Sequence, residues 1–209
     1  RSVLRKNPET YVIVTGCYAQ LQPGEIADID GVDLILGSKE KLRLFEYLDN
    51  VELEDISCIF KEDKPRIFVS EVGKADDEIK GAFSADSDSR TRAFMKIQDG
   101  CDFMRSFSLI PFARGRERSR TAEDVLREAR ELAAHGYREL VLTGVNIGRY
   151  SHQGLGLVEL LRELEAVPEV TRIRISSIEP TTVPAALLEH MAGSTKLCHY
   201  LHLPLQSGD

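Results

Sequence analysis

The chain has 209 residues, of which 42% are hydrophobic and 29% are charged, an ordinary globular composition with room for one large domain or two small ones. The formal net charge of -7 argues against a protein whose whole surface binds nucleic acid. Residues 1–10 are basic without the apolar core of a signal peptide, and no apolar run approaches the roughly 20 residues that span a bilayer, so the sequence predicts a cytoplasmic protein outside membranes.

The first 48 residues alternate strand and helix signals. Residues 11–14 form a β-branched run, and this strand delivers Cys17 at its carboxyl end. Pro23 is expected to start a short helix, and residues 32–36 form a second strand. This order predicts a parallel α/β sheet.

A second helix is expected after Ser38, whose hydroxyl group is suited to an N-cap. Leu42, Phe45 and Leu48 would share one face of that helix. An independent domain of about 48 residues would bury little core. Residues 1–48 are therefore interpreted as the remaining half of a larger domain.

Residues 49–90 carry weaker signals. A strand is expected over residues 67–69, whereas residues 76–88 are polar, acidic and small, as in an interdomain linker. Cysteines stand at positions 17, 58, 101 and 198 without a close pair, so neither a zinc ribbon nor a disulfide scaffold is indicated. Packing explains Cys58 better than ligation does, and a buried free thiol is also the alternative for Cys17 and Cys101.

From residue 91 onward, strands and helices alternate regularly. Thr121 is suited to cap a helix that ends at Gly136. The expected strands cover residues 93–97, 140–142, 172–176 and 200–203, and the other expected helices cover residues 154–167 and 184–191. Four strands separated by three helices predict a parallel sheet with right-handed crossovers. Since a closed eight-stranded barrel takes about 250 residues, this region predicts a partial barrel.

Residues that can carry chemistry follow the ends of these strands. Cys101 lies in the loop that leaves the first strand, where α/β proteins bind ligands. After the second strand, Gly144 and Gly148 allow close backbone approach, and Asn146 can hydrogen-bond to amino-acid or ribose groups. An ordinary turn is the alternative for Gly144 and Asn146, and His202 is interpreted as a packed core histidine.

A basic run follows the cysteine loop, with small residues and one glutamate between its arginines. Its members are Arg114, Arg116, Arg118 and Arg120. Such a run suggests a surface that meets an anion such as phosphate. A solvated charged face is the alternative.

Segments on both sides of Cys101 resemble a known family. Residues 96–101 (KIQDGC), residues 110–115 (IPFARG) and the Ser-Arg pair at 119–120 resemble the radical S-adenosylmethionine (SAM) segment of the tRNA methylthiotransferases. In that family, three cysteines of this segment hold a four-iron four-sulfur cluster. Here Cys101 takes the first ligand position, whereas Arg105 and Ser108 take the other two.

These two replacements oppose cluster assembly. The guanidinium group of Arg105 is a fixed cation without a free lone pair, and the hydroxyl group of Ser108 is a much poorer ligand than a thiolate. The residues therefore predict that the chain assembles this cluster badly or not at all.

The resemblance extends over nearly the whole chain. VTGCYAQ is similar to the last cysteine segment of the family's N-terminal domain, which implies that Cys17 is a ligand of a second, auxiliary cluster. LTGVNIG, RISSIEP and HLPLQSGD are similar to the second, third and fourth strand ends of the radical SAM barrel. By this resemblance, Ser177 and Glu179 would face the ribose or methionine part of SAM, and Gln206 the far wall. The cofactor-binding candidates are Gly144, Asn146, Ser177, Glu179 and Gln206.

The implied fold class is α/β. Residues 1–48 would be the C-terminal half of the methylthiotransferase N-terminal α/β domain, and residues 49–90 a linker. Residues 91–209 would be a partial (β/α) radical SAM barrel, truncated relative to the family.

The implied activity is that of a tRNA methylthiotransferase. CYAQL, TGVNIG and ISSIEP are closest to the branch that adds a methylthio group to C2 of threonylcarbamoyladenosine beside the anticodon. The implied cofactors are SAM and two four-iron four-sulfur clusters. The implied partners are tRNA, which the basic run would contact, and an electron donor such as flavodoxin or ferredoxin.

Two other interpretations stay open. In one, the barrel has lost its cluster and acts as an RNA- or partner-binding module through the basic run. In the other, Arg105 and Ser108 reflect an altered sequence.

Overall fold

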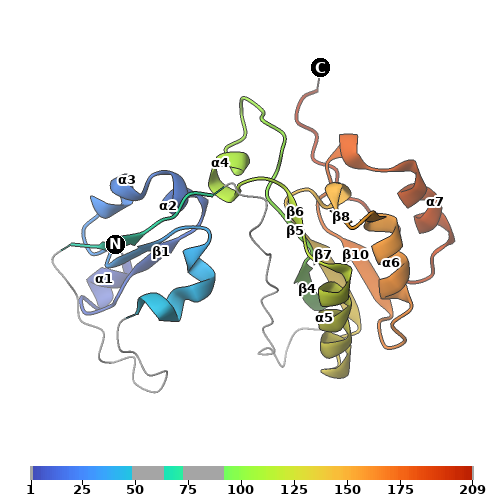
Figure 1. Ribbon diagram of the computed structural model, residues 1–209. Coiled ribbons are helices and arrows are strands. Elements are labelled where there is room, and N and C mark those ends of the chain that lie inside the picture. Colours follow the sequence, from blue (N-terminus) through green and yellow to red (C-terminus); the bar gives the residue numbers. More distant parts are fainter. Residues whose placement is uncertain (1, 49–63, 73–91, 209) are drawn as a thin grey trace. The chain divides into compact units, whose positions relative to one another are not determined.

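The computed structural model describes residues 2–48, 64–72 and 92–208, and Figure 1 shows its elements in chain order. The chain forms two compact units. The N-terminal unit comprises Arg1–Gly73 with Met104–Gly115, and the barrel unit comprises Lys74–Phe103 with Arg116–Asp209. The expected linker at residues 76–88 and Cys58 lie outside the described residues.

The N-terminal unit contains a three-stranded parallel sheet in the order β1-β2-β3. Its strands are β1 (Ile13–Thr15), β2 (Leu34–Leu36) and β3 (Arg66–Phe68), which confirms the strands expected near these positions. All three side chains of the central strand β2 are buried, as in a sheet covered on both faces. The helical segments are α1 (Ser2–Lys6), α2 (Cys17–Leu21), α3 (Pro23–Ala27), the 3-10 segment η1 (Glu40–Tyr47) and α4 (Ile110–Arg114).

The helix expected after Ser38 is wrong in two respects. Ser38 does not cap it, because the Ser38 hydroxyl group donates to the backbone oxygen of Ala113 at 2.7 Å. Leu42 and Phe45 are 59% and 58% exposed, so they do not form an apolar face with the buried Leu48. The reason is local: Arg43 has non-helical angles (φ -117°, ψ 33°), and the segment is a kinked 3-10 helix without a continuous α-helical face.

The barrel unit is built on a second parallel sheet, in the order β10-β7-β4. Its strands are β4 (Arg92–Lys96), β7 (Glu139–Thr143) and β10 (Arg172–Ile175). Residue Glu139 pairs with Arg92 on one side and Arg172 on the other, so the three strands start in register. These strands confirm the first three that the sequence predicts.

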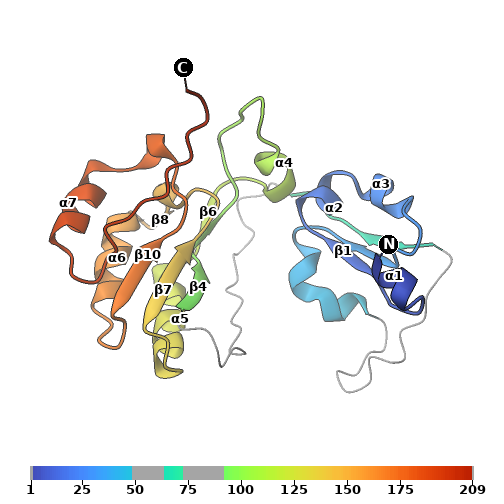
Figure 2. The same cartoon turned by 180° about the vertical axis from the view of Figure 1, so that it is seen from behind.

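Helices pack on one face of this sheet. Figure 1 shows α5 (Ala122–Ala134) and α6 (Leu157–Glu165) in front of the strands, and Figure 2 shows the same sheet from behind. Their buried residues, among them Val125, Leu132, Leu160 and Leu164, form one core with Met95, Leu142 and Ile173 of the strands. The remaining elements are β5 (Gln98–Asp99) paired with β6 (Arg118–Ser119), β8 (Ser151–His152) paired with β9 (Leu155–Gly156), η3 (Ile147–Arg149), η4 (Pro180–Thr182) and α7 (Ala185–Gly193).

Helix α5 begins and ends where the sequence predicts. The hydroxyl group of Thr121 accepts a hydrogen bond from the backbone N–H of Asp124 at 3.2 Å, which is an N-cap contact. Gly136 follows the helix with φ 92°, a left-handed conformation that favours glycine. In the part of the chain that the structure describes, no helix is long and apolar enough to cross a membrane.

The fourth strand expected over residues 200–203 is not formed. Residues 197–202 form two isolated parallel bridges with β10 and its continuation, Ile173 with Leu197 and Ser177 with His202. Between them the backbone N–H of Tyr200 donates to the oxygen of Cys198 at 2.8 Å, and this tight turn interrupts the ladder. His202 is exposed, so the interpretation as a core histidine is wrong.

A buried arginine fastens β4 to α5. The side chain of Arg120 is 1% exposed; it donates to the backbone oxygen of Lys96 at 3.0 Å and forms ion pairs with Asp124 and Glu128. Burial alone would raise the pKa of Asp124, but hydrogen bonds from Arg120 and Arg127 outweigh it and hold that pKa below its ordinary value. The guanidinium group is thus fully compensated inside the unit.

Replacing Arg120 by Ala should destabilise the chain by about 3 to 5 kcal/mol, because Glu128 is left as a buried, uncompensated carboxylate. Urea unfolding measures the change. Arg127→Ala is the matched control, since Arg127 also bonds Asp124 but is 63% exposed, and it should leave the unfolding free energy nearly unchanged. Equal effects of the two changes would contradict the assignment of a structural role to Arg120.

Candidate functional site

The carboxyl ends of β4, β7 and β10 meet at one edge of the barrel unit because the three strands are parallel. The loop of Cys101 follows β4, residues 144–148 follow β7, and residues 176–182 follow β10. This edge is where parallel α/β proteins bind their ligands. It is therefore the candidate site.

A buried amide joins the first two of these loops. Gln98 is 0% exposed. Its Oε1 accepts hydrogen bonds from the backbone N–H groups of Val145 at 2.9 Å and Asn146 at 2.8 Å. Its Nε2 donates to the backbone oxygens of Asp99 at 3.1 Å and Gly100 at 3.0 Å. The sequence places Gln98 inside the family motif but gives no signal for this role, because the two contacts with the β7 loop are set by tertiary structure.

Two glycines of the β7 loop are explained by close packing inside the protein. A Cβ added at Gly144 would lie 3.0 Å from the backbone oxygen of Gln98 and 3.1 Å from its Oε1. A Cβ at Gly148 would overlap the backbone oxygen of Thr182 and lie 2.5 Å from its Oγ1. Both glycines therefore allow two protein segments to pack closely, and this role does not require a ligand.

Asn146 connects the second and third strand ends. Its residue is 4% exposed, and its Oδ1 accepts a hydrogen bond from the hydroxyl group of Thr182 at 2.8 Å. Thr182 also closes the turn after Glu179, because its N–H donates to the Glu179 oxygen at 2.9 Å and its Oγ1 lies 2.9 Å from the same oxygen. A chain of hydrogen bonds thus runs from Gln98 through Asn146 to Thr182.

The other cofactor candidates lie nearer to solvent. Ser177 is exposed, and its hydroxyl oxygen lies 2.6 Å from Nδ1 of His202. Glu179 is half-buried at the end of the same loop, and Gln206 is exposed in the segment after the second bridge. Ser177 and Glu179 therefore follow β10 as expected. Gln206 lies four residues after His202, which bridges to Ser177.

Cys101 is 8% exposed and follows a left-handed turn at Gly100, whose φ is 73°. Its neighbour Asp102 accepts a hydrogen bond from the N–H of Glu117 at 3.1 Å and lies 3.6 Å from the guanidinium group of Arg116. Glu117 in turn pairs with Arg149, and this hydrogen bond raises the pKa of Arg149. The chain directly after Cys101 is therefore held by contacts inside the barrel unit.

The described residues do not fit a cluster held by three thiolates. Arg105 and Ser108 belong to the N-terminal unit, where the Ser108 N–H donates to the oxygen of Arg105 at 3.0 Å. Among the residues that the structure describes, no group of three or more His, Cys, Asp or Glu side chains could hold a metal ion. A thiolate at Cys101 would supply one soft ligand where such a cluster needs three.

Cys17 begins α2 in the N-terminal unit and is half-buried. Its sulfur accepts a hydrogen bond from Nε of Arg114 at 3.4 Å. Arg114 ends α4, which packs on α2. The first arginine of the basic run therefore contacts a thiol.

The rest of the basic run is mostly turned inward. The side chains of Arg116, Arg118 and Arg120 are 59%, 12% and 1% exposed. Arg118 lies 3.9 Å from Asp99, and Arg120 is held in the buried network described above. Of these three, Arg116 alone is well placed to meet an external phosphate.

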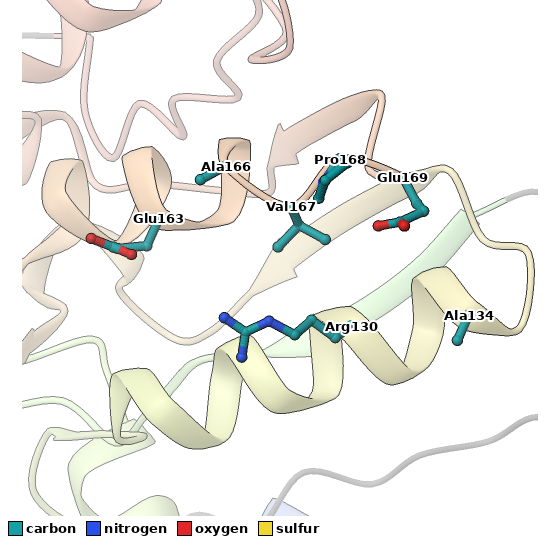
Figure 3. A pocket seen from close by; sticks show the side chains of 7 residues that line it. All are labelled: Arg130, Ala134, Glu163, Ala166, Val167, Pro168 and Glu169. Carbon is teal, nitrogen blue, oxygen red and sulfur yellow. The ribbon is translucent and has the colours of Figure 1, made fainter.

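A separate surface hollow of about 360 Å³ lies between the end of α5 and the turn after α6 (Figure 3). Arg130, Glu163, Pro168 and Glu169 line it among others. The chain continues from these helix ends into the starts of β7 and β10, so the hollow lies at the edge opposite Cys101. Its position argues against a catalytic role.

The family model of the radical SAM superfamily matches residues 95–209, more than half of the chain. The chain belongs to the radical SAM superfamily. The parallel strands of the barrel unit agree with the partial radical SAM barrel that the sequence predicts.

Curated relatives extend the similarity to both units. A threonylcarbamoyladenosine tRNA methylthiotransferase of Bacillus subtilis is 39% identical over all of this chain and 45% of its own length. A tRNA-2-methylthio-N(6)-dimethylallyladenosine synthase of Clostridium tetani is 31% identical over 97% of this chain and 44% of its own length. The chain thus spans about half the length of these curated relatives.

A solved structure is similar over part of the chain. It is the radical SAM methyltransferase TsrM of Kitasatospora setae with cobalamin and a [4Fe-4S] cluster bound, matched over 53% of this chain and 21% of that chain. The identity is 20% and the TM-score 0.43.

Gly148→Ala should destabilise the chain by about 1 to 3 kcal/mol, since the added methyl group overlaps the Thr182 backbone. Thermal or urea unfolding measures this. Gly193→Ala is the control, because nothing lies within 4 Å of that Cβ, and it should be neutral or stabilising. A neutral Gly148→Ala would show that the turn after β10 is free to move away from the β7 loop.

Proposed function

We propose that the chain is part of a tRNA methylthiotransferase that modifies threonylcarbamoyladenosine at C2, next to the anticodon. The observation that carries the proposal is the 39% identity to such an enzyme over the whole chain, including the segments around Cys17 and Cys101. The dimethylallyladenosine enzyme is the nearest alternative by substrate, with 31% identity. Partners of this activity are tRNA and a flavodoxin or ferredoxin as electron donor, all of them in the cytoplasm.

SAM is the proposed ligand of the barrel edge. It supplies a methyl group and, when reduced by a cluster, a radical. Asn146 and the backbone at Gly144 would contact its polar groups, Ser177 and Glu179 its ribose or methionine part, and Gln206 the far wall. These side chains would bind and orient SAM, and none of them can replace the missing thiolates.

The radical step is therefore not assigned to the chain as it stands. Cys101 would be one cluster ligand, whereas Arg105 and Ser108 carry no thiolate. Cys17 is proposed for the auxiliary cluster, with Arg114 donating to its sulfur at 3.4 Å. Hydrogen bonds to ligand sulfurs are among the features that set cluster potentials.

The double change Arg105→Cys/Ser108→Cys should restore a four-iron cluster, because it restores three thiolates at the family's spacing. Iron and sulfide content after anaerobic reconstitution measures this, with Cys101→Ala added to the double change as the control. The unchanged chain should bind far less iron. A full cluster in the unchanged chain would refute the ligand argument, and none in the double variant would remove the main support for the loop assignment.

A second candidate function is RNA binding without a cluster. Its motivation is the segment Met104–Gly115, which contains two arginines and no acidic residue in a chain of net charge -7. Phe107 and Phe112 on this segment are 64% and 52% exposed, and exposed aromatic rings can stack on unpaired bases. Within the basic run, the exposed Arg116 is the proposed phosphate contact.

Arg116→Ala should weaken binding of an anticodon stem-loop RNA and lower the slope of log affinity against log salt by about 1. Fluorescence anisotropy at several salt concentrations measures both. Arg172→Ala is a matched control, since Arg172 is 58% exposed and lies 3.6 Å from a carboxylate, as Arg116 does, but at the opposite ends of the strands. Equal slopes for both variants would make Arg116 a solvated charge.

A further inference from the structure

We propose that Gln98 is a positioning residue that fixes the Cys101 loop against the β7 loop, so that the two present one binding surface for SAM. The inference rests on the proposed SAM site at this edge. It goes beyond that site, because Gln98 itself is buried and would act on SAM only through the two loops that it joins.

The amide of Gln98 uses its full hydrogen-bonding capacity on backbone groups. On one side it accepts from two N–H groups of the β7 loop at 2.8 and 2.9 Å. On the other side it donates to the oxygens of Asp99 and Gly100, the two residues before Cys101, at 3.1 and 3.0 Å. Only a side chain with an acceptor and two donors on one carbon can satisfy both loops at once.

Neighbouring geometry leaves this amide little freedom. Gly144 approaches so closely that an added Cβ would lie within 3.1 Å of Gln98 atoms. The backbone of Gly100, which receives one of the bonds, has a φ of 73°. The amide therefore joins the left-handed turn before Cys101 to the adjacent strand end, and the position of Cys101 follows from it.

The stability of the unit does not depend on this contact alone. The apolar core between the sheet and its helices lies on one face of the strands, and Arg120 independently ties β4 to α5. A change at Gln98 can therefore shift the loops while the unit stays folded. This separation makes the role testable.

Gln98→Glu is the informative variant. The neutral carboxyl group has an acceptor oxygen and an O–H donor, so it can mimic most of the amide. The ionised carboxylate instead faces the oxygens of Asp99 and Gly100 and repels them. Burial raises the pKa of a carboxyl group, so the variant should be neutral at about pH 5 and ionised at about pH 9.

Titration calorimetry with SAM, relative to the unchanged chain at each pH, measures the effect. Affinity of Gln98→Glu should fall by about tenfold or more at high pH and return at low pH. Gln153→Glu, the same change at an exposed hairpin residue, should match the unchanged chain at both pH values. Thermal unfolding at both pH values separates a misplaced loop from an unfolded chain.

Two results would overturn the proposal: unchanged SAM affinity of folded Gln98→Glu at high pH, or a loss that low pH does not reverse. If the variant unfolds at high pH, Gln98→Asn takes its place. It keeps the amide but is one methylene shorter, and it should weaken SAM binding at every pH; full affinity would overturn the proposal.

If the unchanged chain binds no SAM, the proposed SAM site fails separately. Amide hydrogen exchange at Val145 and Asn146 then tests whether Gln98 positions the β7 loop. Loss of protection in Gln98→Glu at high pH, absent from Gln153→Glu, supports the positioning role. Unaltered protection refutes it.

Discussion

The parallel register of β4, β7 and β10 is the constraint on which the barrel unit depends. Because Glu139 stands opposite both Arg92 and Arg172, the three strands start level, and their following loops emerge at one edge. Ion pairs of Glu139 with Arg92, Arg172 and Arg174 lie at the starting edge. The edge with Cys101 has ion pairs of its own, such as that of Arg149 with Glu117, but its first two loops are joined by the uncharged amide of Gln98.

Two buried polar side chains, Arg120 and Gln98, make different connections at the end of β4. Arg120 binds the oxygen of Lys96 and two carboxylates of α5, so it joins the sheet to its covering helix. Gln98 binds backbone groups on both sides and joins one loop to the next. A charge is suited to the first task because its carboxylate partners are fixed on a helix. A neutral amide is suited to the second, because backbone groups offer both donors and acceptors.

Elements with a strong local signal were predictable from the sequence. The cap at Thr121 and the helical spacing of apolar residues gave α5, and the alternation of charged and apolar residues gave β10. Predictions failed where tertiary contacts override local preference. The Ser38 hydroxyl group bonds the Ala113 backbone and does not cap a helix. The turn between Cys198 and Tyr200 interrupts the pairing of the segment that the sequence predicts as a fourth strand.

The candidate site was predictable in composition but not in arrangement. Gly144 and Gly148 carry a loop signal, yet their close neighbours are Gln98 and Thr182, which lie 46 and 34 residues away in the sequence. The arginines at 114 to 120 look alike in sequence, although one bonds a thiol, one is exposed and one is buried among carboxylates. A charge pattern gives the residue type, and only the fold decides whether that charge faces solvent.

The Cys101 loop can keep the fold of its family without being able to hold a cluster, and the reason is physical. The flanking motif residues have structural work that does not need a cluster: Gln98 ties two loops, Ala113 receives Ser38, and Arg120 anchors α5. Arg105 and Ser108 lie between these anchors, where the proposed cluster would demand thiolates but folding does not. The fold can therefore persist with non-ligating residues at these two positions, because none of the three contacts involves them.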